Sequence, residues 1–147
     1  MRSILVVCAG NLCRSPMAAG LLKQALPDCL TVSAGFIALD GEQADPIAID
    51  VMQKRGIDIR EHRALRLAPW LVGQADLILV MTQEQRSALY RQFPSASGKV
   101  FRLGEHGGYD VPDPVGQSRI VFEQVFDLVS VCVEAWAARI EAVSKIT

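Results

Sequence analysis

The fold of this chain is decided near its start by residues 4–16, which read Ile-Leu-Val-Val-Cys-Ala-Gly-Asn-Leu-Cys-Arg-Ser-Pro. Ile4 to Cys8 is a short apolar run rich in β-branched residues, which predicts a buried strand. Ser15-Pro16 predicts the start of a helix, because serine caps free amide groups and proline suits the first helical position. A buried strand is therefore expected to pass through a short loop directly into a helix.

Further strands are expected along the rest of the chain. Apolar runs predict them at residues 30–34, 75–81 and 99–103, with helical segments between them. Alternation of strand and helix predicts an α/β fold with a parallel sheet covered by helices on both faces. Such sheets bind ligands beyond the carboxyl ends of their strands, which is where Cys8 stands.

The helices are marked by their capping residues. The first is expected to end before Pro27. Asp45-Pro46 predicts a second start, with Gly56 as its stop. Thr82 predicts a third, with Gln85 three residues later as its capping-box partner. A loop containing Gly and Pro at residues 104–116 is followed by a long closing helix from residue 118 to about residue 143.

Composition narrows the possible functions. The 147 residues, half of them apolar, suit a single domain over residues 1–147 with a real core, and a monomer is expected. A net charge of -1 argues against a nucleic-acid surface. The apolar run at residues 4–7 is too short for a signal core or a membrane span. We therefore expect a cytoplasmic protein without membrane insertion.

The cysteines are expected to be thiols rather than a disulfide framework. They are Cys8, Cys13, Cys29 and Cys132. No Cys-x-x-Cys pair occurs, and the two histidines, His62 and His106, stand apart. This spacing predicts neither a metal site nor a cofactor. Cys29 and Cys132 are interpreted as structural or incidental.

The loop between the first strand and the first helix carries the chemistry. Unpaired amides and the helix dipole attract an anion there, and they favour the reactive thiolate of Cys8. Gly10 and Asn11 tolerate left-handed backbone conformations, which a tight loop needs. Arg14, separated from Cys8 by five residues, adds a planar fork that can bind two phosphate oxygens. The alternative is that Cys8 is an inert, buried structural cysteine. That interpretation leaves the pattern of Gly10, Asn11 and Arg14 around it unexplained.

Residues 7–16 resemble the signature of the low-molecular-weight protein tyrosine phosphatase family. The resemblance continues at residues 33–35, 44–46, 76–81 and 112–114, and so covers nearly the whole chain. It implies a three-layer α/β/α domain with a four-stranded parallel sheet in the order 2-1-3-4 and a phosphate-binding loop after strand 1. The phosphate-binding residues would be Ala9, Gly10, Asn11, Leu12, Cys13, Arg14 and Ser15.

An acid is also needed, because the leaving oxygen of a phosphate ester takes a proton. Asp113, between two prolines, matches the family's Asp-Pro acid, while Asp110 is a competitor without a following proline. The expected reaction starts with attack by Cys8 on phosphorus and ends with hydrolysis of a phosphocysteine. Arg14 would stabilise the phosphoryl oxygens in both steps.

Supporting roles follow from the same resemblance. It gives Asn11 a left-handed conformation held by Ser15 and Ser33, although Ser33 can equally be a plain strand-end hydroxyl. Cys13 either forms a protective disulfide with Cys8 or is a small buried side chain. His62 and Arg63 are interpreted as a supporting or surface pair.

The expected substrate cleft follows the second strand. Phe36, Ile37 and Leu39 would form one wall, with Leu39 where many relatives carry a large aromatic residue. Val115 stands where relatives often carry tyrosine after the Asp-Pro. A loop hydrophobe that covers the core is the alternative for Leu39. We expect a cleft with weaker aromatic stacking than is usual in the family.

The resemblance to the bacterial branch implies a phosphotyrosine protein as substrate, namely a tyrosine autokinase of polysaccharide export. Two other functions compete. A thiol-coupled arsenate reductase needs further cysteines, and residues 82–131 contain none. A non-catalytic phosphotyrosine-binding module would bind phosphate through the same loop but would need neither a thiolate nor an acid.

Overall fold

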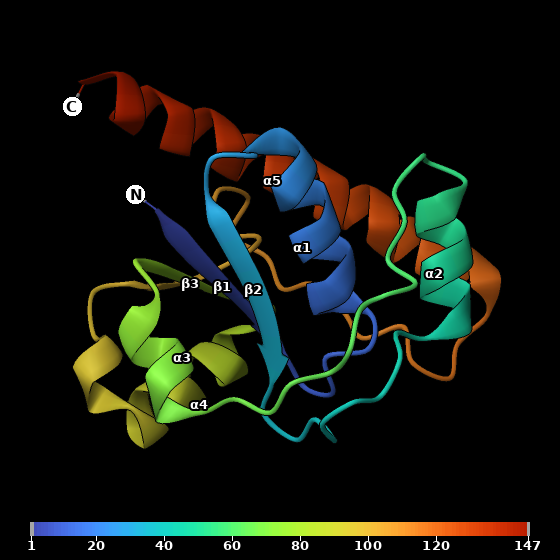
Figure 1. Cartoon of the computed structure of the whole chain (residues 1–147), viewed down its shortest axis with the longest axis horizontal. Coiled ribbons are helices and arrows are strands. Elements are labelled where there is room, and N and C mark those ends of the chain that lie inside the picture. Colours follow the sequence, from blue (N-terminus) through green and yellow to red (C-terminus); the bar gives the residue numbers. More distant parts are fainter. Residues whose placement is uncertain (1, 147) are drawn as a thin grey trace.

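A computed structural model describes residues 2–146 of the chain (Figure 1). Strands and helices alternate along it. The strands are β1 (Ser3–Cys8), β2 (Leu30–Gly35), β3 (Leu77–Val80) and β4 (Val100–Arg102). The helices are α1 (Arg14–Ala25), α2 (Pro46–Gln53), α3 (Pro69–Gln74), α4 (Gln83–Gln92) and α5 (Arg119–Ile146), with a short 3-10 turn, η1 (Pro94–Ala96), before β4.

The sheet is four-stranded and parallel, with the order β2-β1-β3-β4, as expected. β1 lies in its centre, where Cys8 pairs with Gly35 of β2 and Val7 pairs with Val80 of β3. Side chains of a strand point alternately to the two faces. Ile4, Val6 and Cys8 accordingly pack in one core, and Leu5 and Val7 pack in the other.

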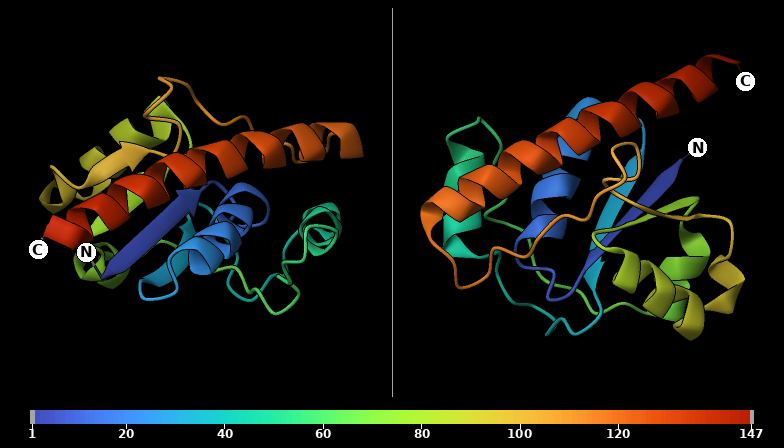
Figure 2. Two further views of the ribbon diagram at one scale, coloured as in Figure 1. Left: turned by 90° about the horizontal axis from the view of Figure 1, so that it is seen from above. Right: turned by 180° about the vertical axis from the view of Figure 1, so that it is seen from behind.

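Helices cover both faces of the sheet, which makes three layers. α1, α2 and α5 supply the core on the face of Cys8, and α3 and α4 supply the core on the opposite face (Figure 1). α5 runs along the length of the molecule beside α1 (Figure 2). The predicted buried strand is confirmed, because residues Ile4 to Cys8 are all at most 3% exposed.

The start of α1 differs from the prediction. The helix begins at Arg14 with Cys13 as its N-cap, and no side chain caps it. Ser15 is not the cap, because its hydroxyl is used by Cys8 and Asn11. The first amides of α1 thus remain open toward the loop, as an anion site needs.

The other helix starts follow the prediction. Asp45 caps α2 by accepting from the amide of Ile47, and Pro46 is the first helical residue. Thr82 and Gln85 form the predicted capping box at α4. Helix α3 was not predicted: it has six residues, and no side chain caps it.

Candidate functional site

The loop from Cys8 to Ser15, here called the Cys8–Ser15 loop, turns its carbonyl groups outward. Four of these oxygens accept hydrogen bonds from the surrounding chain: Cys8 from Phe36 N at 3.1 Å, Ala9 from Ile37 N at 2.9 Å, Asn11 from His62 Nε2 at 2.8 Å and Leu12 from Asp45 N at 2.9 Å. A trans peptide directs its N–H opposite to its carbonyl. The N–H groups of residues 9, 10, 12 and 13 therefore face the inside of the loop, where they form an anion-binding concavity.

Asn11 holds the bend of this loop. Its φ of 57° is the left-handed conformation that was expected. Its Nδ2 donates to Ser15 Oγ at 2.7 Å, also as expected. The second expected partner, Ser33, stays a prediction, while Asn11 Oδ1 accepts from Leu65 N at 2.9 Å. Ser33 lines a pocket that it shares with His62.

The segment around His62 and Leu65 reaches the loop because it runs beside the end of β2. Gly35 donates to Leu65 O at 2.9 Å, and Leu67 donates to Gly35 O at 2.9 Å. The carbonyl of Asn11 can only accept, so His62 carries a proton on Nε2. Burial lowers the pKa of His62, which favours the neutral ring. The expected supporting role of His62 is thus a direct contact with the loop backbone.

Cys8 lies at the base of the loop, 3% exposed, with Sγ 2.9 Å from Ser15 Oγ. Asn11 Nδ2 can only donate, so Ser15 Oγ accepts from it. The hydroxyl proton of Ser15 remains available for the sulfur. When Cys8 is a thiolate it can only accept, and Ser15 then stabilises its negative charge.

Arg14 connects this loop with residues 110–115, here called the 110–115 loop. Its guanidinium is almost fully buried and donates from Nη1 to Val111 O at 3.0 Å. Its Nη2 lies 3.6 Å from Asp113 Oδ2. Asp113 also accepts at Oδ1 from Val115 N at 3.1 Å, and its side chain is 45% exposed. The two loops, far apart in the sequence, therefore meet at Arg14.

Two cavities meet at Arg14 and Asp113. The smaller, of about 30 Å³, is lined by Cys8, Gly10, Leu12, Cys13, Arg14, Asp113 and Val115. The larger, of about 490 Å³, has Phe36 and Ile37 on one side and Thr82, Glu84, Gln85 and Ala88 of the α4 region on the other. The nucleophile and acid expected from the sequence thus share one cavity.

The residues of the expected cleft wall lie at different places. Phe36 and Ile37 line the larger cavity, and Val115 lines the smaller one. Leu39 lines neither of these two cavities, and its side chain is 64% exposed. Ile37 lies beside the loop because its amide binds Ala9 O, and the place of Leu39 in the substrate cleft stays a prediction.

Cys13 lines the same small cavity as Cys8, and both are free thiols in the structure. Burial raises the pKa of Cys13, and the nearby Asp45 carboxylate adds to this effect. The thiol therefore stays protonated. Cys132 is also buried and lies 3.3 Å from the hydroxyl of Tyr109, far from the loop in sequence.

Comparison with known families agrees with this geometry. The family profile described as low molecular weight phosphotyrosine protein phosphatase matches residues 3–145. The chain belongs to this family. In this phosphatase family, a similar protein is the probable low molecular weight protein-tyrosine-phosphatase EpsP of Ralstonia solanacearum. It is 49% identical over 142 residues, which cover 97% of this chain and 98% of EpsP.

Solved structures of family members superpose closely. Wzb of Vibrio vulnificus in complex with benzylphosphonate has a TM-score of 0.91 at 38% identity, covering 94% of this chain and 98% of Wzb. The arginine phosphatase YwlE, as a cysteine-to-serine mutant with a phosphorylated active-site serine, has a TM-score of 0.90 at 31% identity, covering 95% of each chain.

Two further observations concern the described part of this phosphatase-family chain. Among residues 2–146, no helix is long and apolar enough to cross a membrane. In the same described part of the chain, no group of three or more His, Cys, Asp or Glu side chains is arranged to hold a metal ion.

Proposed function

We propose that this protein hydrolyses phosphotyrosine in proteins through a phosphocysteine formed on Cys8. One observation carries the proposal: Cys8, Arg14 and Asp113 line one cavity, at a loop whose amides face inward. No metal or cofactor takes part in the proposed reaction. The chain would work as a cytoplasmic monomer.

In the first step the Cys8 thiolate attacks phosphorus in line, so that an S–P bond forms and the P–O bond to the tyrosine ring breaks. Asp113 gives its proton to the departing phenolate oxygen. The loop amides and Arg14 stabilise the equatorial phosphoryl oxygens. Arg14 Nη2 faces Asp113 in the free enzyme. A bound phosphate dianion would replace that carboxylate as partner of Nη2 and leave Asp113 beside the leaving oxygen.

In the second step water attacks the phosphocysteine and the S–P bond breaks. Asp113, now a carboxylate, takes the proton from this water, and inorganic phosphate leaves. The thiolate of Cys8 is the leaving group of this step. The hydroxyl of Ser15, 2.9 Å from the sulfur, stabilises it as it forms.

The physiological substrate that we propose is a tyrosine autokinase of polysaccharide export. It is supported by the resemblance to the bacterial branch of the family and by the similarity to EpsP. The similarity to YwlE, named an arginine phosphatase, makes phosphoarginine the first competing substrate to test.

The test compares wild-type protein with Cys8→Ser and Asp113→Asn on para-nitrophenyl phosphate and on phosphotyrosine and phosphoarginine peptides. We expect no turnover with Cys8→Ser, and about a 100-fold to 10,000-fold loss with Asp113→Asn, the range typical of general acid catalysis. Both variants should still bind phosphate, and Cys29→Ser should remain fully active. Full activity in Cys8→Ser would overturn the mechanism.

The same assay separates the competing functions. Wild-type binding of a phosphotyrosine peptide without turnover would favour a binding module. Faster hydrolysis of the phosphoarginine peptide than of the phosphotyrosine peptide would identify phosphoarginine as the substrate. Arsenate reduction coupled to thioredoxin would favour the reductase. Capture of a tyrosine autokinase by Cys8→Ser would identify the proposed partner.

A further inference from the structure

Asp110 lies three residues before the proposed acid, and its carboxylate is bound on two sides. Its Oδ1 accepts from the amide of Gln83 at 3.0 Å and from Arg102 Nη1 at 3.1 Å. Gln83 N is the first amide of α4, which no backbone carbonyl of that helix can satisfy. Asp110 thus ties the start of the 110–115 loop to α4 and to β4.

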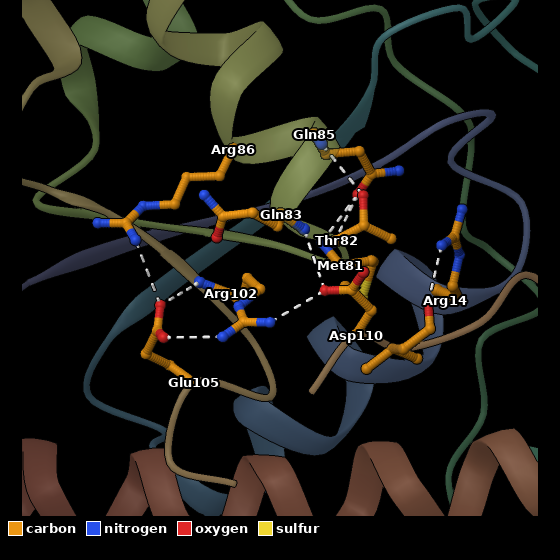
Figure 3. Close-up of polar contacts among 10 residues, drawn as sticks. Arg14, Met81, Thr82, Gln83, Gln85, Arg86, Arg102, Glu105 and Asp110 are labelled. Atoms are coloured by element: carbon orange, nitrogen blue, oxygen red, sulfur yellow. Dashed lines mark hydrogen bonds and ion pairs between the residues drawn. The ribbon is translucent and has the colours of Figure 1, made fainter. Parts of the chain in front are cut away.

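Arg102, the partner of Asp110, is itself held in place. Its side chain is only 16% exposed, and its Nη2 lies 3.2 Å from Glu105 Oε2. Glu105 Oε1 in turn lies 3.6 Å from Arg86 Nη1, and the Arg86 guanidinium lies over the ring of Phe101. Figure 3 shows this row of contacts, which leads from Arg86 through Glu105 and Arg102 to Asp110. The side chain of Arg102 therefore offers Asp110 a fixed anchor.

Val111, the next residue, is fixed by its backbone. Its N–H donates to Met81 O at 2.9 Å, and its carbonyl accepts from Arg14. Its side chain is fully buried. Pro112 then has a restricted φ. Between Asp110 and Asp113 the backbone thus has little freedom, so the anchored segment that begins at Asp110 sets where the Asp113 carboxyl lies.

Beyond these anchors, Asp113 has weaker contacts of its own. Its carboxylate lies 3.6 Å from Arg14 and accepts from Val115 N at 3.1 Å, two residues ahead in the same loop. The contact with Arg14 would be lost when phosphate occupies that guanidinium. From then on, the fixed segment at 110–112 is what keeps the acid beside the leaving oxygen.

We infer that Asp110 is a positioning residue for Asp113, which it holds at the mouth of the Cys8 cavity by anchoring the 110–115 loop to Gln83 and Arg102. The inference rests on the proposed function. The sequence offers Asp110 as a competing acid, but its carboxylate is bound to α4 and β4. A role confined to stability is the alternative, and an ion pair that is half exposed, as Asp110 is at 48%, contributes little to stability.

The experiment compares substrates whose leaving groups differ in pKa, because only a defect in general acid catalysis depends on that pKa. A departing phenolate of high pKa depends on general acid catalysis more strongly than one of low pKa. We therefore compare kcat/KM for phenyl phosphate with kcat/KM for para-nitrophenyl phosphate. Asp110→Ala should lower the first about tenfold or more and the second less than about threefold, since a misplaced acid retains part of its effect.

Two further variants complete the design. Asp110→Asn keeps an oxygen that can accept from Gln83 N, and we expect it to restore part of the activity on phenyl phosphate. The control is Asp127→Ala. Asp127 lies on α5, and its carboxylate forms an ion pair with Arg55 at 3.5 Å. This variant should leave both substrates unaffected. Thermal unfolding of Asp110→Ala should stay within a few degrees of the wild type.

The decisive measurement is a double-mutant cycle. If Asp110 acts through Asp113, Asp110→Ala should cost nothing more in an Asp113→Asn background. An equal loss on both substrates, an equal loss in that background, or unchanged kinetics of Asp110→Ala would each overturn the inference. Failure of the proposed function looks different, because Asp113→Asn alone would then be fully active.

Discussion

Gly35 ends β2 directly beside the Cys8–Ser15 loop, and its lack of a side chain leaves room for that loop. A Cβ atom added there would lie 2.6 Å from Ala9 O, 2.8 Å from Asn11 N and 3.0 Å from Ala38 Cβ. Two of these three atoms belong to the loop backbone, which cannot turn away as a flexible side chain would. We therefore expect Gly35→Ala to displace the loop.

The size of the effect follows from these distances. Non-bonded carbon atoms normally approach to about 3.5 Å, so the loop backbone would have to move by about 0.5–1 Å. Overpacking of this kind costs about 1–3 kcal/mol, or a Tm lower by about 2–12 °C for a domain of this size. A misplacement near 1 Å at a reacting group costs on the order of 100-fold in rate. Activity should therefore suffer more than stability.

The assay is kcat/KM on para-nitrophenyl phosphate, together with the rise in Tm that inorganic phosphate produces. For Gly35→Ala we expect kcat/KM to fall about 30-fold to 100-fold and the phosphate-induced rise in Tm to shrink. Gly73→Ala is the matched control, because its Cβ in α3 would meet nothing within 4 Å. It should keep full activity. Wild-type kcat/KM in Gly35→Ala would refute the argument.

Three further outcomes are expected. His62→Ala removes the 2.8 Å hydrogen bond to Asn11 O and should lower kcat/KM about tenfold, whereas His62→Gln should lose less. Because burial raises the pKa of Cys13, iodoacetamide at pH 8 should leave Cys13 unmodified in the folded protein but not in urea, as mass spectrometry would show. The hydrogen bond to Cys132, with burial, raises the pKa of Tyr109 to about 12. The contribution of Tyr109 to the free energy of unfolding should therefore be fully present below about pH 10, the pKa of an unfolded tyrosine. It should be lost as the pH rises toward 12. Urea unfolding of Tyr109→Phe should show less of this fall; equal falls would contradict it.

Signals that lie within a few residues predicted the fold well. The apolar run at residues 4–8 is a strand, and Asp45-Pro46 and Thr82 start helices as expected. The expected strand at 75–81 is shorter, Leu77–Val80, and the Asp76 carboxylate just before it binds the amides of Arg2 and Ser3. Helix α3 is short and has no side-chain cap, so Pro69 at its first position is a weak signal of its start.

Contacts between distant segments account for what the sequence missed at the site. Leu65 donates to Asn11 through its backbone amide, which almost any residue could supply. The identity of the side chain at position 65 therefore does not indicate the contact. Ile37 and Leu39 are alike in character, and it is the hydrogen bond from Ile37 N to Ala9 O that places Ile37 beside the loop.

The same reasoning explains why the chemistry of Cys8 depends on residues throughout the chain. The outer carbonyls of the Cys8–Ser15 loop bind the segment between β2 and α2 and also His62, which follows α2, while Arg14 binds the 110–115 loop. A loop that turns its amides inward cannot use them to bind its own carbonyls, and the contacts of Asn11 and Cys8 with Ser15 are made by side chains. Its shape therefore comes from these tertiary partners. Gly35→Ala and His62→Ala touch no reacting atom and leave Cys8, Arg14 and Asp113 in place. Each should nevertheless reduce turnover, because it alters the shape of the Cys8–Ser15 loop.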